Sequence, residues 1–516
     1  MKILTVLLIS ITASVSGYGQ TLFHVKTETR PAGKNYNSDN PVVAKIYQFP
    51  ERVHQFNVDT TLNSFLIQLR GINESGENLK HKGSLALYNF SEETVKWSIK
   101  VNYFNGRVKQ SGNLPFVTKG GKRYLIDIEN GNRKWKVKDH IYYLVPSENT
   151  AVGYKYASSP EFANAMEGID LSTGKIKWKR DINRDYSWND ACRLSDSVLL
   201  IVSSGLHTVN LKNGKGWDFN TVTGEENYSQ AAIDNMTEVA SNELTYIHTL
   251  AQTYRLVREV ASNVILDDPD IYFASREKIL KTDFYGNVKW ISSLERDKTS
   301  KSSIFEKDSL LYMVNYGYAI MVNRIIKYGT PYFCMFNSTT GEQGFCSFPG
   351  DRKDIITSYV AKGDAIFFLF KDKIEKYSIN DGQRLLTRPY DVKELGELKY
   401  FLDENVFFKS DTIYKPLCGP DSTKYPVLTG SGKTLLFNGD LNVVDILPFD
   451  NIYVCYHVTK NYLFLRNHKR TVVINKSGNA VASLNVSADA FFIGSKLYDK
   501  RDNCIVEIDT GELLNE

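Results

Sequence analysis

Histidine and cysteine are the residues through which this 516-residue chain could most readily do chemistry, so their spacing comes first. The eight histidines stand at 24, 54, 81, 140, 207, 248, 457 and 468, and none shows the H-x-x-x-H spacing of a zinc site. The chain also has no G-x-S-x-G nucleophile elbow of a serine hydrolase. An active site assembled from residues far apart leaves no such spacing, so an enzyme stays open as an alternative.

Two further runs resemble ligand-binding loops without completing them. Residues 429–437 read TGSGKTLLF, but a phosphate-binding loop needs glycine where Val427 stands. Residues 181–190 read DINRDYSWND, but a calcium loop of the EF-hand type needs glycine at Tyr186 and glutamate at Cys192. We therefore interpret the first as a hairpin turn and the second as a solvated loop, and we expect no metal site.

The six cysteines contain no C-x-x-C pair, so redox, haem-attachment and zinc-ribbon patterns are absent from the sequence. Cys334 and Cys346 flank a run that reads as a β-hairpin, whose two strands would bring the thiols together. The sequence leaves two interpretations, a disulfide between these residues or two half-buried thiols that pack as small apolar side chains.

The N-terminus has the order of a secretory signal peptide. Lys2 is followed by an apolar stretch over 3–15 and by small residues over 16–19, so cleavage is expected before Gln20. We expect 1–19 to be removed and 20–516 to form one exported domain, periplasmic or secreted. No later apolar run reaches the length of a membrane span, and a net charge of +4 gives no strong field for nucleic acid.

A repeated unit organises the chain: a strand, a polar turn with glycine, and a second strand that ends in tryptophan. Five of the six tryptophans occupy this position: Trp97, Trp135, Trp178, Trp217 and Trp290. Their turns include Gly131, Gly174 and Gly286, and weaker copies without tryptophan surround Gly341, Gly382, Gly478 and Gly511. The first three intervals are 38, 43 and 39 residues, which is typical of one four-stranded propeller blade. We expect the tryptophans to fill the gaps between blades.

The unit with Asp170, Thr173, Gly174 and Trp178 resembles the repeat of pyrroloquinoline-quinone-type β-propellers. That group includes quinoprotein alcohol dehydrogenases and the propeller lipoprotein of the outer-membrane barrel assembly machinery. The resemblance implies an all-β propeller of four-stranded antiparallel sheets. We expect eight blades, with seven to ten allowed, and the N-terminal segment is a candidate to complete the last one. The chain lacks the adjacent cysteine pair of the dehydrogenases, so we expect no cofactor.

Residues 225–262 contain neither glycine nor proline and carry apolar residues every three or four positions. That spacing predicts a helical insertion within the propeller. The segment is acidic, so a protein is a more plausible partner for it than an anionic lipid surface. The alternative is a helical hairpin that packs against the propeller's own face.

Together these features favour an exported, non-catalytic propeller that binds a protein or glycan partner in the cell envelope. The alternative is an enzyme with a site in the axial channel, either a quinone-dependent dehydrogenase or a carbohydrate-active lyase or hydrolase. A propeller fold alone does not decide between them, because the same scaffold carries many unrelated functions.

Overall fold

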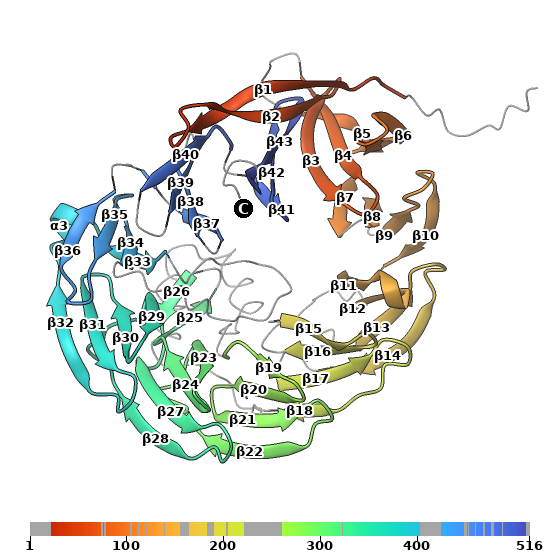
Figure 1. The fold of residues 1–516 in the computed structure, drawn as a ribbon. Coiled ribbons are helices and arrows are strands. Elements are labelled where there is room, and N and C mark those ends of the chain that lie inside the picture. Colours follow the sequence, from red (N-terminus) through yellow and green to blue (C-terminus); the bar gives the residue numbers. More distant parts are fainter. Residues whose placement is uncertain are drawn as a thin grey trace, which may run out of the picture.

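The structure is a computed structural model in which four-stranded antiparallel sheets, the blades, follow one another around a ring (Figure 1). It describes residues 22–511 apart from 74–75, 77–78, 104–105, 112–113, 120–121, 139, 155–164, 183–189, 203–204, 221–260, 322–323, 403–424, 448–450, 453, 460, 468–469, 476–478 and 488. The predicted signal peptide and all but the last residues of the predicted helical insertion at 225–262 lie outside the described residues.

Blades 1 to 5 take their strands in chain order from the inside of the ring outward. Their strands are β3 (Arg52–Asp59), β4 (Ser64–Ile72), β5 (Leu79–Asn89) and β6 (Thr94–Asn102); β7 (Gly106–Ser111), β8 (Leu114–Lys119), β9 (Lys122–Ile126) and β10 (Arg133–Val137); β11 (His140–Val145), β12 (Thr150–Tyr154), β13 (Ala165–Asp170) and β14 (Ile176–Asp181); β15 (Asp190–Ser195), β16 (Val198–Val202), β17 (Gly205–Asn210) and β18 (Asp218–Asn220); and β19 (Ile265–Asp267), β20 (Asp270–Ala274), β21 (Lys278–Asp283) and β22 (Val288–Ser293).

Blades 6 to 9 continue in the same direction. Their strands are β23 (Ser302–Lys307), β24 (Leu310–Asn315), β27 (Tyr332–Asn337) and β28 (Gln343–Ser347); β29 (Ser358–Lys362), β30 (Ala365–Leu369), β31 (Lys373–Ser378) and β32 (Arg384–Pro389); β33 (Leu398–Phe401), β34 (Tyr425–Thr429), β35 (Thr434–Phe437) and β36 (Val443–Ile446); and β37 (Val454–Val458), β38 (Tyr462–Arg466), β39 (Thr471–Asn475) and β40 (Ala480–Leu484). Described helical turns include η1 (Pro146–Glu148) and α3 (Val392–Leu395), and residues 510–511 are also helical.

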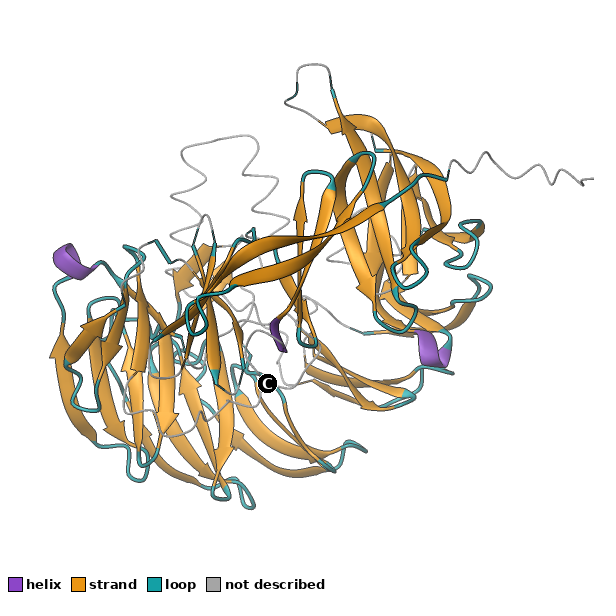
Figure 2. Ribbon diagram, turned by 45° about the horizontal axis from the view of Figure 1, so that its top comes forward, coloured by secondary structure: helices purple, strands orange, loops and turns teal. Residues whose placement is uncertain are grey.

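Blade 10 is built from both ends of the chain. It contains β41 (Phe491–Ile493), β42 (Lys496–Arg501) and β43 (Cys504–Asp509), and its outer strand is β2 (Pro41–Gln48) from the N-terminal part. Strand β1 (Lys26–Asn35) pairs with β2 and also, at Gly33 to Asn35, with β40 of blade 9. Figure 2 shows this long β1–β2 ribbon crossing the side of the ring where the chain closes.

The side chains at this closure are bonded across the two ends of the chain. The Tyr47 hydroxyl donates to Glu507 at 3.1 Å, and the Lys496 ammonium donates to the other carboxylate oxygen of Glu507 at 2.6 Å. Strand β1 joins blades 9 and 10 into one nine-stranded sheet by backbone pairing, and these side-chain bonds add to the closure.

The all-β propeller predicted from the repeat is confirmed, and the described strands form ten blades. Eight are separate four-stranded sheets, and two lie within the nine-stranded sheet. Ten is the upper end of the expected range, and eight is too low. Blades 6 to 10 lack the tryptophan that marks blades 1 to 5, so the weaker turns around Gly341, Gly382, Gly478 and Gly511 do not show from sequence alone that each belongs to a separate blade.

The core lies between blades rather than inside any one of them. The second strands β20 and β30 are buried at every residue, because each of their faces packs against a neighbouring blade. The outer strand β14 buries Trp178 alone among its six residues. This gradient from inside to outside explains why inner segments are continuously apolar and outer ones are mostly polar.

Candidate functional site

The five repeat tryptophans join each blade to the next one in the chain. Every indole N–H donates to a main-chain carbonyl in the turn between the last two strands of the following blade. The pairs are Trp97 to Ile128 at 2.6 Å, Trp135 to Leu171 at 2.6 Å, Trp178 to Leu211 at 2.8 Å, Trp217 to Phe284 at 2.9 Å and Trp290 to Ser338 at 3.0 Å. The indole N–H groups are thus all hydrogen-bonded within the protein. Each tryptophan lies against the turn of the next blade, and the five do not gather in one place.

The repeat glycines lie under these indole rings. A Cβ atom placed on Gly131, Gly174 or Gly286 would come within 2.9 Å of the ring of Trp97, Trp135 or Trp217, respectively. Gly174 also has a φ of +71°, a backbone conformation that other residues adopt at a cost. Both the turn and the close approach of the ring therefore require glycine there.

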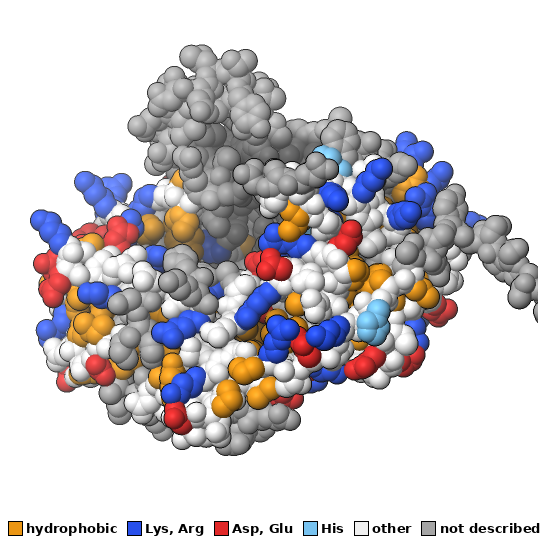
Figure 3. Space-filling model, turned by 90° about the horizontal axis from the view of Figure 1, so that it is seen from above, with side chains coloured by type: hydrophobic (Ala, Val, Ile, Leu, Met, Phe, Trp, Pro, Cys, Tyr) orange, Lys and Arg blue, Asp and Glu red, His pale blue; other side chains and the backbone are white. Residues whose placement is uncertain are grey.

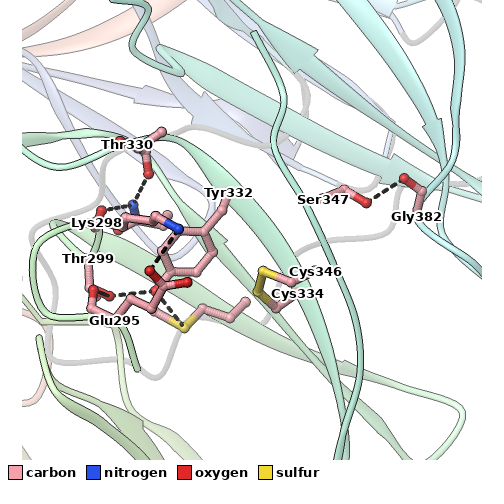
Figure 4. The surroundings of a disulfide bond; sticks show 11 residues. Glu295, Lys298, Thr299, Thr330, Tyr332, Cys334, Cys346, Ser347 and Gly382 are labelled. Carbon is pink, nitrogen blue, oxygen red and sulfur yellow. Dashed lines mark hydrogen bonds and ion pairs between the residues drawn. A yellow bond between two sulfur atoms is a disulfide. The ribbon is translucent and has the colours of Figure 1, made fainter. Parts of the chain in front are cut away.

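Cys334 and Cys346 stand opposite each other in the register of β27 and β28 and form a disulfide in the structure. Figure 4 shows the disulfide near Tyr332, whose hydroxyl shares a hydrogen bond of 2.8 Å with Thr299. On the other side, Ser347 donates to the carbonyl of Gly382 in blade 7 at 2.6 Å. The cysteine pair therefore belongs to the packing of blade 6 and not to a reactive centre.

An aspartate–histidine pair lies within blade 4, and Arg180 of blade 3 connects the two blades through the same aspartate. Nδ1 of His207 lies 2.7 Å from Asp218, and the Arg180 guanidinium lies 2.6 Å from the same carboxylate. Burial raises the pKa of Asp218, but the bonds from His207 and Arg180 outweigh it and hold that pKa below its usual value. The other ring nitrogen, Nε2, is buried and has no hydrogen-bond partner among the described residues. A histidine base would need a nucleophile there, so this group is better suited to holding two blades together.

A second group with histidine lies where the inner strands of blades 9 and 10 meet. The His457 ring stacks on Phe492 with centroids 3.7 Å apart, and burial lowers the pKa of His457 to about 4. Nearby, the Arg466 guanidinium lies 3.8 Å above the Tyr456 ring and donates to the carbonyl of Ala490 at 2.8 Å. His457 is therefore neutral near pH 7 and packs the two blades together. Within the described parts of the chain, His, Cys, Asp and Glu nowhere gather in a group of three that could hold a metal ion.

Blade 6 contains an additional element that a propeller does not need for its closure. Strands β24 and β27 are hydrogen-bonded neighbours, yet residues 316–331 lie between them in the chain. These residues form a separate two-stranded sheet, β25 (Tyr318–Met321) with β26 (Arg324–Lys327), and Figure 1 shows it inside the ring of blades. This hairpin was not predicted from the sequence; the 16 residues that separate β24 from β27 are the one local signal of it.

The base of the hairpin is fixed to the body of the blade. The Tyr318 carbonyl accepts from the Lys301 N–H at 3.0 Å, and Tyr328 N–H donates to the Gly317 carbonyl at 3.1 Å. Tyr318, Ile326 and Tyr328 are buried. An isolated two-stranded hairpin is only marginally stable in water, so these contacts hold it in place.

Charged groups reinforce the same base. The Lys327 ammonium donates to the Asp354 carbonyl, and burial lowers the pKa of Lys327 to about 8. The Asp354 carboxylate lies 2.8 Å from Lys373. Burial lowers the pKa of Lys373, but its bonds to Asp354 and Asp351 outweigh that and raise it to about 12. Lys373 thus stays charged and anchors the segment on which Lys327 rests.

The hairpin combines an exposed aliphatic residue with tyrosines where it leaves the blade. Ile325 is 60% exposed on β26. The half-buried Tyr316 ring lies 5.6 Å from Tyr318 and 6.2 Å from Tyr359, and the Tyr359 hydroxyl accepts from Ser303 at 2.7 Å. Half-buried tyrosines beside an exposed aliphatic residue are the composition of a protein-binding surface. We name Tyr316, Ile325 and Tyr359 the hairpin surface.

Comparison with known proteins gives a limited result. No protein-family model matches the chain, and no curated protein matches its sequence. Similar solved structures include BamB from Moraxella catarrhalis, with 12% identity, a TM-score of 0.33, and coverage of 73% of this chain and 96% of that one. The computationally designed Ika8 protein has 11% identity, a TM-score of 0.37, and coverage of 72% and 98%. AztD from Citrobacter koseri has 10% identity, a TM-score of 0.30, and coverage of 71% and 91%.

Sequence identities and TM-scores this low give no basis for assigning a function. The pyrroloquinoline-quinone-type repeat stays a resemblance in sequence, and the propeller architecture rests on the sheets themselves. Among the described residues, no helix is both long and apolar enough to cross a membrane.

Proposed function

We propose that the protein is an exported, non-catalytic propeller that binds a protein partner in the cell envelope, periplasmic or secreted, through the hairpin surface. The observation that carries the proposal is the β25–β26 hairpin, an element extra to the blade that is fixed at its base and exposes Ile325. Loops that exceed the needs of a fold are usually functional. The export part rests on the pattern of residues 1–19.

The non-catalytic part rests on what two of the described histidines do. His457 stacks on Phe492, and His207 is paired with a carboxylate that also faces Arg180. Both groups are occupied in contacts between blades. A general base needs a proton-transfer partner and room for substrate, and these positions supply packing instead.

A photo-crosslinking amino acid placed at Ile325 tests the proposal directly. The matched control is the same amino acid at Leu385, which is 55% exposed on the outer strand of blade 7. We expect one adduct of defined mass in cells from position 325 and none from 385, and we expect its loss when Tyr359 is changed to Arg. Equal adducts from both positions, or adducts from 385 alone, would contradict the proposal. Mass spectrometry of the N-terminus checks export, with Gln20 expected as the first residue.

A further inference from the structure

Positive charge is concentrated in blade 2, far from the hairpin surface in the chain. Residues 106–138 contain nine Lys and Arg but only two Asp and Glu, whereas the whole chain has a net charge of +4. The nine are Arg107, Lys109, Lys119, Lys122, Arg123, Arg133, Lys134, Lys136 and Lys138. One blade therefore carries more net positive charge than the complete protein.

The register of β9 and β10 places several of these cations on one face of the sheet. Trp135 pairs with Leu125 and points toward blade 3, where its indole reaches Leu171. Side chains alternate along a strand, so Lys136 and its partner Tyr124 lie on the opposite face. The Arg133 guanidinium lies 4.9 Å above the Tyr124 ring and so shares that face.

Lys122 and Lys138 extend this face toward the end of the blade, since Lys122 begins β9 and Lys138 directly follows β10. Lys136 and Lys138 are exposed, and Lys122 is half-exposed. Residues two apart in a strand lie about 7 Å from each other, so the cations form a row along the strand. We name Lys122, Arg133, Lys136 and Lys138 the cationic face.

Many lysines of other blades form ion pairs with carboxylates, but the described lysines of the cationic face do not. Elsewhere the pattern is pairing within a blade: Lys134 with Asp127 at 3.2 Å, Lys179 with Glu167 at 3.1 Å and Lys281 with Asp270 at 2.9 Å. Among the described residues, no carboxylate forms an ion pair with Lys122, Lys136 or Lys138. Like charges so placed repel one another, and an external anion would relieve that repulsion.

Blade 1 adds further cations next to this face. Lys82 and Lys100 are exposed, and the Arg70 guanidinium lies 4.7 Å above the Tyr103 ring. The carboxylates of residues 51–139 are Glu51, Asp59, Glu92, Glu93, Asp127 and Glu129, and Glu74, Glu77 and Asp139 outside the described residues. Figure 3 looks onto the side of the ring formed by the first strands, and Lys and Arg side chains gather in its upper right part.

We propose that the cationic face binds a linear acidic polysaccharide. A row of cations along one strand matches a chain with repeated anionic groups better than it matches a flat bilayer. Lysines, which act as point charges, supply most of the row, and they suit carboxylate or sulfate groups without base-specific geometry. The one aromatic ring on the face, Tyr124, is covered by Arg133, so it offers no free surface for stacking nucleic-acid bases.

The test is binding of the mature protein to immobilised polygalacturonate and dextran sulfate, with neutral dextran as the polymer control. The test variant is Lys122→Gln/Lys136→Gln/Lys138→Gln. The matched control is Lys175→Gln/Lys353→Gln/Lys399→Gln, three exposed lysines of other blades that also form no ion pair among the described residues. Both variants lower the net charge equally, so only a local site distinguishes them. Circular dichroism melting checks that both are folded.

We expect wild type to bind both acidic polymers, to ignore neutral dextran and to bind more weakly as salt rises. The test variant should weaken binding at least about tenfold, because it removes three of the four cations of the cationic face, whereas the control should change binding less than about twofold. An equal loss in the two variants would show a general charge effect and overturn the site. Absence of wild-type binding, or tighter binding to duplex DNA or to phosphatidylserine vesicles, would also overturn the proposal. The result is independent of crosslinking at Ile325, so the two proposals can fail separately.

Discussion

The indole nitrogen of Trp178 donates to the main-chain carbonyl of Leu211 at 2.8 Å, which bonds the outer strand of blade 3 to the turn of blade 4. The same tryptophan lies over Gly214 of that turn, where a Cβ atom would come within 2.8 Å of its ring. One donor and one glycine thus fix the distance and the orientation between consecutive blades. The same contact is repeated from blade 1 to blade 5, so each of these blades is bonded to the next one at the outer part of the ring.

Substitution of a repeat glycine should therefore lower the unfolding free energy by more than the strain of its positive φ alone would. Gly174→Ala would place a Cβ atom 2.7 Å from the Trp135 ring at a φ of +71°, and we expect a loss of about 2–4 kcal/mol in unfolding free energy. The control is Gly363→Ala, because Gly363 has a φ of +56° and nothing within 4 Å of such a Cβ atom. That control should lose only about 1–2 kcal/mol. Urea titration of both variants measures the difference, and equal losses would contradict the role given to the ring.

The cysteine pair of blade 6 should be oxidised in the exported protein. Cys334 and Cys346 are separated by 12 residues, and closing a loop of that size stabilises the folded state by about 2–3 kcal/mol. Non-reducing mass spectrometry of peptides should find the linked pair, and Cys334→Ser/Cys346→Ser should lower the melting temperature. The control is Cys504→Ser, a half-buried residue outside the disulfide. Two alkylated thiols at 334 and 346 in the exported protein would refute the pairing.

His457 should make folding stability depend on pH between about 6.5 and 4. Burial lowers its pKa in the folded protein to about 4, below the value near 6.5 of an exposed histidine. Its contribution is therefore fully present above pH 6.5 and is lost as the pH falls toward 4, because the unfolded chain takes up the proton first. The upper limit is about 3.5 kcal/mol, since the pKa falls from about 6.5 to about 4 and each pKa unit corresponds to about 1.4 kcal/mol.

Denaturant titrations at pH 7 and pH 5 measure this effect. Wild type should lose more stability between the two values than His457→Leu does, because the variant has no proton to bind at this position. Other groups also titrate in this range, so the comparison is the difference between the proteins. His24→Leu is the control, since His24 is exposed, and it should follow wild type. Parallel curves for wild type and His457→Leu would contradict the prediction.

Pyrroloquinoline quinone and calcium should give no activity to the mature protein. The chain has no adjacent cysteine pair, which the resembling dehydrogenases carry against the cofactor. We expect no quinone-dependent dye reduction with simple alcohols, and no change of the melting temperature on adding the quinone, because a ligand that binds the folded state raises it. A quinoprotein dehydrogenase serves as the positive control in the same assay. Turnover above the background would favour the enzymatic alternative.

The sequence alone determined the class of fold because the evidence for it is local. Glycine turns and tryptophans recur at about 40-residue intervals, and each copy predicts one blade without reference to the others. The disulfide partners could also be suggested locally, because Cys334 and Cys346 lie in one hairpin. The hairpin of residues 316–331 was missed, since its short apolar runs look like ordinary blade strands.

Only the tertiary structure decided the number of blades, the closure and the candidate surfaces. Lys45 of β2 pairs with Glu507 of β43, at the other end of the chain, and no local pattern marks a partner at that distance. The cationic face likewise depends on register, because alternate residues of a strand face opposite neighbours and only the pairing shows which lysines share a face. Whether a lysine meets a carboxylate is also set by the register within the blade, as for Lys134 and Asp127. Local periodicity therefore specifies the repeated unit, whereas contacts between distant segments specify how many units close the ring and what they expose.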